Sequence, residues 1–256
     1  MNRTLRPNSQ PLRTVARFFL AGAITLLVMT APALAQDVTI GFGEGAGVTE
    51  RAIQVIALIT ILSLAPSILV MVTSFTRIVV VLSLLRTAIG VQQSPPNTVV
   101  ISLALFLTAF VMGPIFQQAY DAGIKPLMND QIELPQAFEQ ASKPFQKFML
   151  SHVREKDLGL FVSLAGDEQP EEPGDISLRV LVPAFMISEL KRAFEIGFLL
   201  FVPFIVIDMV VASVLMSMGM MMLPPIIISL PFKLIFFVLV DGWHLVAGSL
   251  VQSYAN

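Results

Sequence analysis

Residues 207–233 read IDMVVASVLMSMGMMMLPPIIISLPFK, two apolar runs separated by a methionine-rich break that ends in Pro224-Pro225. The runs continue outward over residues 178–215 and 226–251, and each is long enough for a bilayer, which takes about 20 apolar residues per helix. Glycine and paired prolines break helices. The stretch therefore predicts a membrane hairpin with its methionines at the tip.

The tip has two interpretations from its residues alone. Methionine is unbranched, flexible and polarizable, so it fills irregular gaps in cores and also forms soft surfaces that repack around a changing object. The first property predicts a core or lipid-facing stripe, and the second predicts a compliant collar. The residues concerned are Met218, Gly219, Met220, Met221 and Met222.

The composition indicates a polytopic membrane protein. The chain has 256 residues, of which 55% are hydrophobic and 13% charged, with a mean hydropathy of +0.79. Soluble domains are about 25% charged. Because the chain has no cysteine, disulfides, zinc-thiolate sites and thiol nucleophiles are excluded. The formal net charge of -2 indicates no nucleic-acid partner.

The N-terminal residues 1–35 have the layout of a secretory signal peptide. Basic residues precede the apolar run 18–30, and Ala33-Leu34-Ala35 supplies a small-x-small cleavage site. We expect cleavage after Ala35. An uncleaved signal anchor is the alternative, although the apolar run is short for a membrane span.

The remaining chain predicts an all-α membrane protein in three parts. Residues 36–119 form a first kinked helical hairpin that turns at Pro95-Pro96. Residues 120–182 form a small helical domain in water, and residues 183–256 form the second hairpin. In the first hairpin we expect an apolar helix kinked at Pro66 and continuing to Arg86, followed by a helix over 98–119.

The middle domain contains a predicted amphipathic helix. Its apolar side chains recur at spacings of three and four, and Pro144 interrupts them or begins a new helix. The stripe consists of Phe138, Ala141, Phe145, Phe148, Met149 and His152. An acidic loop over 166–174 follows it. If the signal peptide is cut, this domain faces the periplasm and both hairpin tips face the cytoplasm.

Two charges in the second hairpin are expected to pair. A charge at the bilayer centre costs at least about 2.5–3.5 kcal/mol, so such residues usually face a partner. Asp208 and Lys233 lie at nearly equal distances in sequence from Met221. At 1.5 Å per residue, both lie about 18–20 Å from the tip. We therefore predict a buried ion pair, within one subunit or between neighbours.

Other charges lack an evident partner. Arg77 and Arg86 face a predicted helix, 98–119, that contains no acid. Water or another chain would then supply their counter-charge. Arg77 and Arg86 fit the positive-inside rule, whereas Lys191 and Arg192 do not. Together these charges favour a subunit that buries its faces against copies or partners.

The sequence predicts no enzymatic activity, metal or cofactor. Its histidines, His152 and His244, are far apart, and the chain has no phosphate-binding glycine loop or nucleophile motif. Asp241 precedes Trp243-His244, a fragment that is compatible with a proton relay but equally with an interfacial anchor.

Several long stretches resemble the FliP family of flagellar type III export proteins. The resemblance covers nearly all of the chain after the signal peptide, but not the acidic loop. It rests on residues 75–86 (FTRIVVVLSLLR), 92–97 (QQSPPN), 183–198 (PAFMISELKRAFEIGF), 207–225, 230–233 (LPFK) and 240–243 (VDGW).

The resemblance implies a definite assembly. Members of this family form the core of the export gate as five FliP, four FliQ and one FliR, and their hairpins wind into a closed conical ring. FlhA and FlhB lie below it, and FliO assists assembly. Unfolded rod, hook and filament subunits pass through its centre across the inner membrane, with much of the assembly on the periplasmic side of the basal body.

The resemblance also assigns roles to residues. Met218, Met220, Met221 and Met222 match a gasket that closes the pore, and Gly219, Pro224 and Pro225 turn the hairpin that carries it. The expected buried charges and subunit contacts are Arg77, Arg86, Glu189, Lys191, Arg192, Glu195, Asp208, Lys233 and Asp241.

Three alternatives stay open. The chain is equally compatible in fold with the homologous gate subunit of a virulence type III secretion system, although a cleavable signal peptide favours the flagellar branch. Asp208, Lys233 and Asp241 would also suit an ion or proton channel that conducts without partners. A structural scaffold would tolerate loss of the methionine tip.

Overall fold

The computed structural model describes residues 48–91, 93–166, 176–220 and 222–255, and every element in them is a helix. The all-α membrane fold expected from the sequence is confirmed. The predicted signal peptide with Ala35, nearly all of the acidic loop, and Met221 lie outside the described residues. The chain divides into two compact units, Met1–Leu58 and Ile59–Asn256, and the packing below is that of the second.

The helices follow one another in a simple order. They are α2 (Val48–Val72), α3 (Phe75–Ile89), α4 (Asn97–Ala119), the π-helix η1 (Tyr120–Ile124), α5 (Lys125–Met128), α6 (Leu134–His152), α7 (Glu155–Ala165), α8 (Leu178–Ser217), α9 (Pro225–Leu239) and α10 (Gly242–Gln252). The helices predicted over 98–119 and 178–215 are confirmed as α4 and α8. The boundary placed at 183 falls inside α8.

The first predicted helix is broken where we expected continuity. Thr73 and Ser74 separate α2 from α3, while Pro66 lies inside α2. The Thr73 hydroxyl donates to the Leu69 carbonyl at 2.7 Å, and the Thr76 hydroxyl donates to the Val70 carbonyl at 3.0 Å. Hydroxyls that bond to the backbone compete with the helical ladder, so this cluster ends α2.

The last predicted helix is also broken. α9 and α10 meet at an angle of 62°, and Asp241 between them has a left-handed backbone with φ 50°. Gly242 packs so tightly that a Cβ there would lie 2.1 Å from the Phe237 ring. The single helical stretch expected over 226–251 is thus divided into α9 and α10, because Asp-Gly at this position supplies a turn.

The middle domain differs from its prediction in two ways. α6 runs through Pro144 without interruption, and Phe138, which was expected on the buried stripe, is exposed. Phe148, Met149 and His152 of the same stripe are buried. The boundary placed at residue 120 falls within a helical stretch that continues from α4 through η1 and α5.

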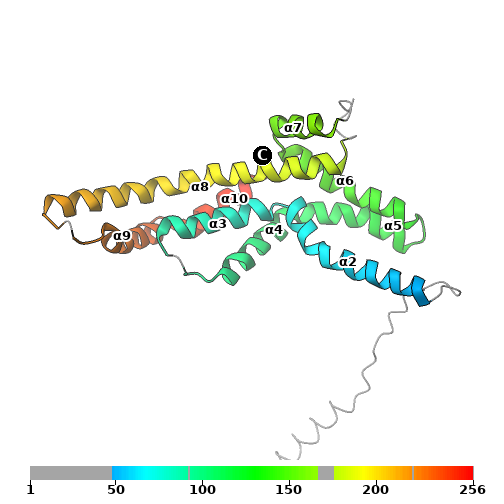
Figure 1. Ribbon diagram of the computed structural model, residues 1–256, viewed down its shortest axis with the longest axis horizontal. Coiled ribbons are helices and arrows are strands. Elements are labelled where there is room, and N and C mark those ends of the chain that lie inside the picture. The colour runs from blue at the N-terminus through cyan, green and yellow to red at the C-terminus, as the bar shows by residue number, and fades with distance from the viewer. Residues whose placement is uncertain (1–47, 92, 167–175, 221, 256) are drawn as a thin grey trace, which may run out of the picture. The chain divides into compact units, whose positions relative to one another are not determined.

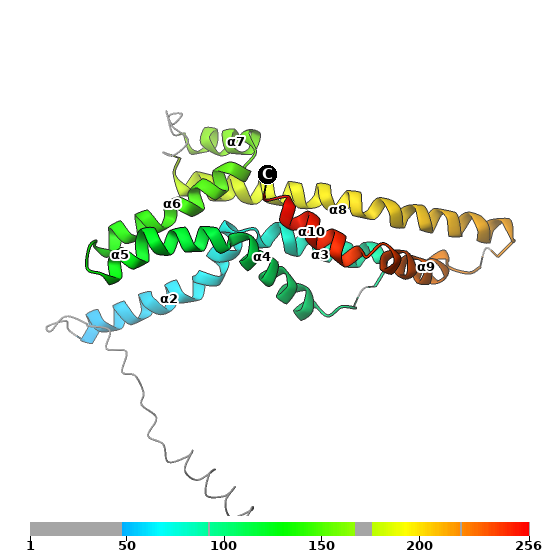
Figure 2. The same cartoon turned by 180° about the vertical axis from the view of Figure 1, so that it is seen from behind.

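Helix α3 is the element around which the others pack. It lies along α8, its principal partner, and also contacts α4 and α9; Figures 1 and 2 show α3 and α8 side by side from opposite directions. Its buried face is formed by Ile78, Val81, Leu82, Leu85, Ala88 and Ile89. A second core joins α6 to the first part of α8 through Phe148, Met149, Leu181 and Phe185.

Three described helical stretches are long and apolar enough to cross a membrane, namely Val55–Val72, Asn97–Met128 and Leu178–Ser217. The bent pair α9–α10 would make a fourth span if it counts as one. α3 is shorter than a span of about 20 residues and instead has its core face covered by protein.

The contact between η1 and α6 generates a prediction. A Cβ added at Gly123 would lie 2.5 Å from the Ala137 carbonyl oxygen, a backbone atom that cannot move aside cheaply. We expect Gly123→Ala to lower the free energy of unfolding by about 1–3 kcal/mol, as overpacking does. The measurement is chemical unfolding of the purified full chain in detergent.

Gly159 supplies the matched control. It is exposed in the interior of α7, and a Cβ added there meets nothing within 4 Å. Gly159→Ala should therefore be neutral or stabilise the chain by up to about 1 kcal/mol, since alanine favours helix. Equal effects of the two substitutions would contradict the close approach at Gly123.

Candidate functional site

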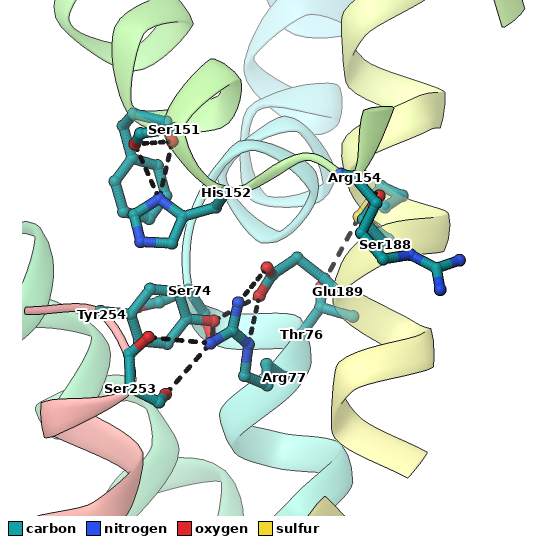
Figure 3. A network of polar contacts seen from close by, with 12 residues as sticks. Ser74, Thr76, Arg77, Ser151, His152, Arg154, Ser188, Glu189, Ser253 and Tyr254 are labelled. Carbon is teal, nitrogen blue, oxygen red and sulfur yellow. Dashed lines mark hydrogen bonds and ion pairs between the residues drawn. The ribbon is translucent and has the colours of Figure 1, made fainter. Parts of the chain in front are cut away.

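A buried ion pair joins α3 to α8. The side chains of Arg77 and Glu189 are 1% and 0% exposed. The Arg77 guanidinium donates from Nε to Glu189 Oε2 at 2.9 Å and from Nη2 to the other carboxylate oxygen, Oε1. This two-point contact, seen in Figure 3, matches the planar fork of arginine to the carboxylate.

Residues after α10 complete this pair. Arg77 Nη1 donates to the Ser253 hydroxyl at 3.0 Å and to the Ser253 carbonyl at 3.4 Å. The Tyr254 hydroxyl donates to Glu189 Oε2, and the Arg77 guanidinium carbon lies 3.9 Å from the centroid of the Tyr254 ring. The cation is therefore satisfied by a carboxylate, a hydroxyl, a carbonyl and a ring face.

The expectation that Arg77 takes its partner from water or another chain was wrong. The next helix in the sequence, α4, holds no acid, but it is not the main neighbour of α3. In the structure α3 packs mainly against α8, and α8 brings Glu189 to Arg77. The signal available in the sequence was Glu189, an acid inside an apolar run, since such acids usually face a cation.

The one pair that the sequence predicted, Asp208 with Lys233, is present within one chain. Lys233 Nζ on α9 lies 2.6 Å from Asp208 Oδ2 on α8, and the Ser229 hydroxyl donates to Asp208 Oδ1 at 2.6 Å. Lys233 is 5% exposed, whereas Asp208 is 40% exposed. The pair therefore fastens the two arms of the hairpin and still presents an acid at the surface.

The remaining charges lie elsewhere on the chain. Arg86 donates to the Pro95 carbonyl at 3.3 Å and to the Asn97 side chain. It therefore holds the turn between α3 and α4, and its partners are neutral groups and not an acid. Lys191 and Glu195 form an exposed pair at 2.8 Å on α8. Within the described residues, the structure gives the side chains of Arg192 and Asp241 no hydrogen bond or ion pair.

A third polar cluster was not foreseen from the sequence. Arg154 donates from Nε and Nη2 to the two oxygens of Asp157, each at 2.8 Å, and the Ser188 hydroxyl donates to Asp157 at 2.6 Å. The bonds from Arg154 hold the pKa of the Asp157 carboxyl below its usual value. The cluster attaches α7 to α8 at Ser188, the residue before Glu189.

The methionine tip is a turn between α8 and α9. Gly219 has φ 73° and Pro225 begins α9. Met218 and Met222 are exposed, the latter by 98%, and Met220 is half-buried. Beside the tip lies an apolar groove of about 650 Å³ between the two helices, lined by residues that include Val210, Val214, Met218, Ile228, Phe232 and Phe236.

The buried pair predicts a large effect of a small substitution. Glu189→Gln leaves the Arg77 cation buried without a counter-charge, which lowers the free energy of unfolding by about 3–5 kcal/mol. Glu195→Gln breaks only the exposed pair with Lys191 and should lower the free energy of unfolding far less, because water screens exposed ion pairs. Chemical unfolding of the full chain in detergent checks both, and equal losses would contradict the difference in burial.

Asp157 predicts a pH dependence of stability. Because its folded pKa is lowered, its contribution is complete above the unfolded value of about 3.9 and is lost as the pH falls through the folded value. Asp157→Asn should therefore be less stable than the parent at neutral pH and lose less stability on acidification. Unfolding measured from pH 7 downward checks this, and parallel pH curves would contradict it.

Comparison with known proteins agrees with these observations. A model of the FliP family matches residues 58–250. The flagellar biosynthetic protein FliP of Caulobacter vibrioides is 67% identical over 247 residues, which cover 96% of this chain and 93% of that protein. The protein of the same name from Bacillus subtilis is 55% identical over 80% of this chain and 93% of its own. That of Aquifex aeolicus is 48% identical over 91% and 98%. The chain therefore belongs to the FliP family.

Proposed function

We propose that the chain is a pore-forming subunit of the flagellar type III export gate in the bacterial inner membrane. It would pass unfolded rod, hook and filament subunits without catalysis and without a cofactor. The observation that carries this role is family membership over most of the chain, because the relatives compared above are named flagellar biosynthetic proteins.

The proposed assembly explains the surface of the second hairpin. α8 and α9 expose a nearly continuous series of large apolar side chains, among them Phe198, Leu199, Val210, Ile227, Phe232 and Val238. Exposed apolar faces of this extent are covered by lipid or by other subunits. Further copies of the chain, with FliQ and FliR in the expected five-to-four-to-one ratio, would cover these faces. FlhA and FlhB would lie below the ring, and FliO would assist its assembly.

In this assembly the methionine tip would act as a gasket. Met218 and Met222 are exposed at a glycine turn, so their side chains do not pack into the buried core of their own chain. Repeated around a ring, such flexible side chains could close on each other and deform around a chain of any sequence. The periplasmic placement of α5, α6 and α7 belongs to the same proposal.

The alternatives are less well supported. Of the residues that suggested a proton channel, Asp208 is bound to Lys233 and Ser229, which leaves Asp241 as the one acid of that set whose side chain has no bond among the described residues. A virulence secretion system would use the same fold, yet the relatives compared above carry flagellar names. Conductance by the chain alone, without partners, would favour the channel.

The gasket generates a prediction. Replacing Met220, Met221 and Met222 together by alanine shortens the side chains that close the pore, so we expect intact assembly with increased leakage of ions or small solutes. Leakage is measured in cells or vesicles that contain the complete gate. Met128→Ala is the control, because Met128 is 70% exposed at the end of α5, away from the tip. A tight membrane in the triple variant would contradict the gasket.

Deletion of the gene tests the export role itself. We expect loss of secreted rod and hook subunits together with loss of motility, both restored by the intact gene. Paralysed cells that still carry normal external filaments would exclude an export role, because filament subunits would then have left the cell without this chain.

A further inference from the structure

The short segment after α10 contacts three other parts of the molecule. The Tyr254 hydroxyl donates to Glu189 of α8 and lies 3.4 Å from the carbonyl oxygen of Ser74, at the junction of α2 and α3. Its ring lies 5.9 Å from Phe148 and 5.1 Å from His152, both on α6. We propose that Ser253 and Tyr254 form a latch that joins α3, α6 and α8, and that protonation of His152 opens it.

The bonds of His152 fix the form of its ring. The side chain is 6% exposed, and Nδ1 lies 2.8 Å from the Phe148 carbonyl. A carbonyl can only accept a hydrogen bond, so Nδ1 carries the proton and Nε2 is the unprotonated nitrogen. Nε2 is buried and has no hydrogen-bond partner among the described residues. A second proton would thus be added to a buried atom that no acceptor faces.

The charged groups around the ring offer no free counter-charge for an imidazolium. Arg77 on α3 and Arg192 on α8 oppose a positive charge on the ring, whereas Glu189 on α8 favours it. Both Glu189 oxygens already accept bonds, from Arg77 and from Tyr254. On α6 itself, the neighbouring Ser151 hydroxyl lies near Nδ1, the nitrogen that is already protonated. No free acid in the described part of the chain is therefore placed to receive the new charge.

Burial lowers the pKa of His152 below its usual value near 6.5. The contribution of the neutral ring to stability is complete above about pH 6.5 and is lost as the pH falls through the folded value. An imidazolium must then reach water, so it leaves the stack with Phe148 and Tyr254. Loss of that stack releases Tyr254 from Glu189 and exposes Ser74 beneath it.

Ser74 is a suitable reporter position for this opening. It is fully buried, and its hydroxyl has no hydrogen bond among the described residues, so Ser74→Cys changes little. The chain has no cysteine of its own, which makes the new thiol unique. We would label the full chain in native membranes with N-ethylmaleimide and follow the labelling rate from about pH 8 to about pH 5, the range in which histidine titrates.

A second thiol corrects for the chemistry of the label. A separate variant, Ser163→Cys, places a thiol at an exposed position of α7. Dividing the labelling rate at Ser74→Cys by the rate at Ser163→Cys removes the pH dependence of thiolate formation. We expect the corrected rate at Ser74→Cys to rise about tenfold or more on acidification and to return at pH 8. Reversal on return to pH 8 distinguishes latch opening from denaturation.

Two further substitutions separate the parts of the latch. Tyr254→Phe keeps the ring but loses the bond to Glu189, so labelling at pH 8 should rise about tenfold, as expected for a lost hydrogen bond to a charged group. His152→Phe keeps a stacked ring that cannot be protonated and should abolish the acid response. An unchanged rate in Tyr254→Phe would overturn the latch, and an unchanged acid response in His152→Phe would overturn the trigger.

Discussion

The packing of this chain depends on one buried contact, the pair of Arg77 with Glu189. An isolated cation inside an apolar bundle is very unfavourable, whereas a cation with a two-point carboxylate contact and further acceptors is tolerated. The pair therefore fixes the register of α3 against α8, because a shift by one residue would separate the charges. The aliphatic side chains of α3 then pack against α8 in the register that the ion pair sets.

Polar side chains occur at the points where helices break or join. Thr73 and Thr76 end α2, Arg86 holds the first turn, and Lys233 fastens α9 to α8. Apolar contacts alone tolerate sliding of one helix along another, since they are non-directional. Hydrogen bonds and ion pairs have fixed lengths and directions. The apolar face of each helix thus supplies cohesion, and a few polar groups select one arrangement.

The two ion pairs show where reasoning from the sequence succeeds and where it fails. Asp208 and Lys233 belong to adjacent arms of a hairpin, so their equal spacing from the tip was enough to predict the contact. Arg77 and Glu189 are separated by 112 positions. Their contact depends on which of several apolar helices packs against α3, and apolar faces of similar composition do not distinguish these partners. The same limitation hid the contact of Tyr254 with α6.

The sequence by itself determined the helical class, the membrane-length runs, the hairpin at the methionine tip and the family, since these follow from local hydrophobicity, helix breakers and long motifs. Only the tertiary structure decided the break at Thr73-Ser74, the bend at Asp241 and the partners of Arg77. At these positions, hydrogen bonds within the local backbone compete with contacts to residues distant in sequence, and the outcome decides where a helix ends and which side chains pair. Such competition is resolved only when the helices are packed together.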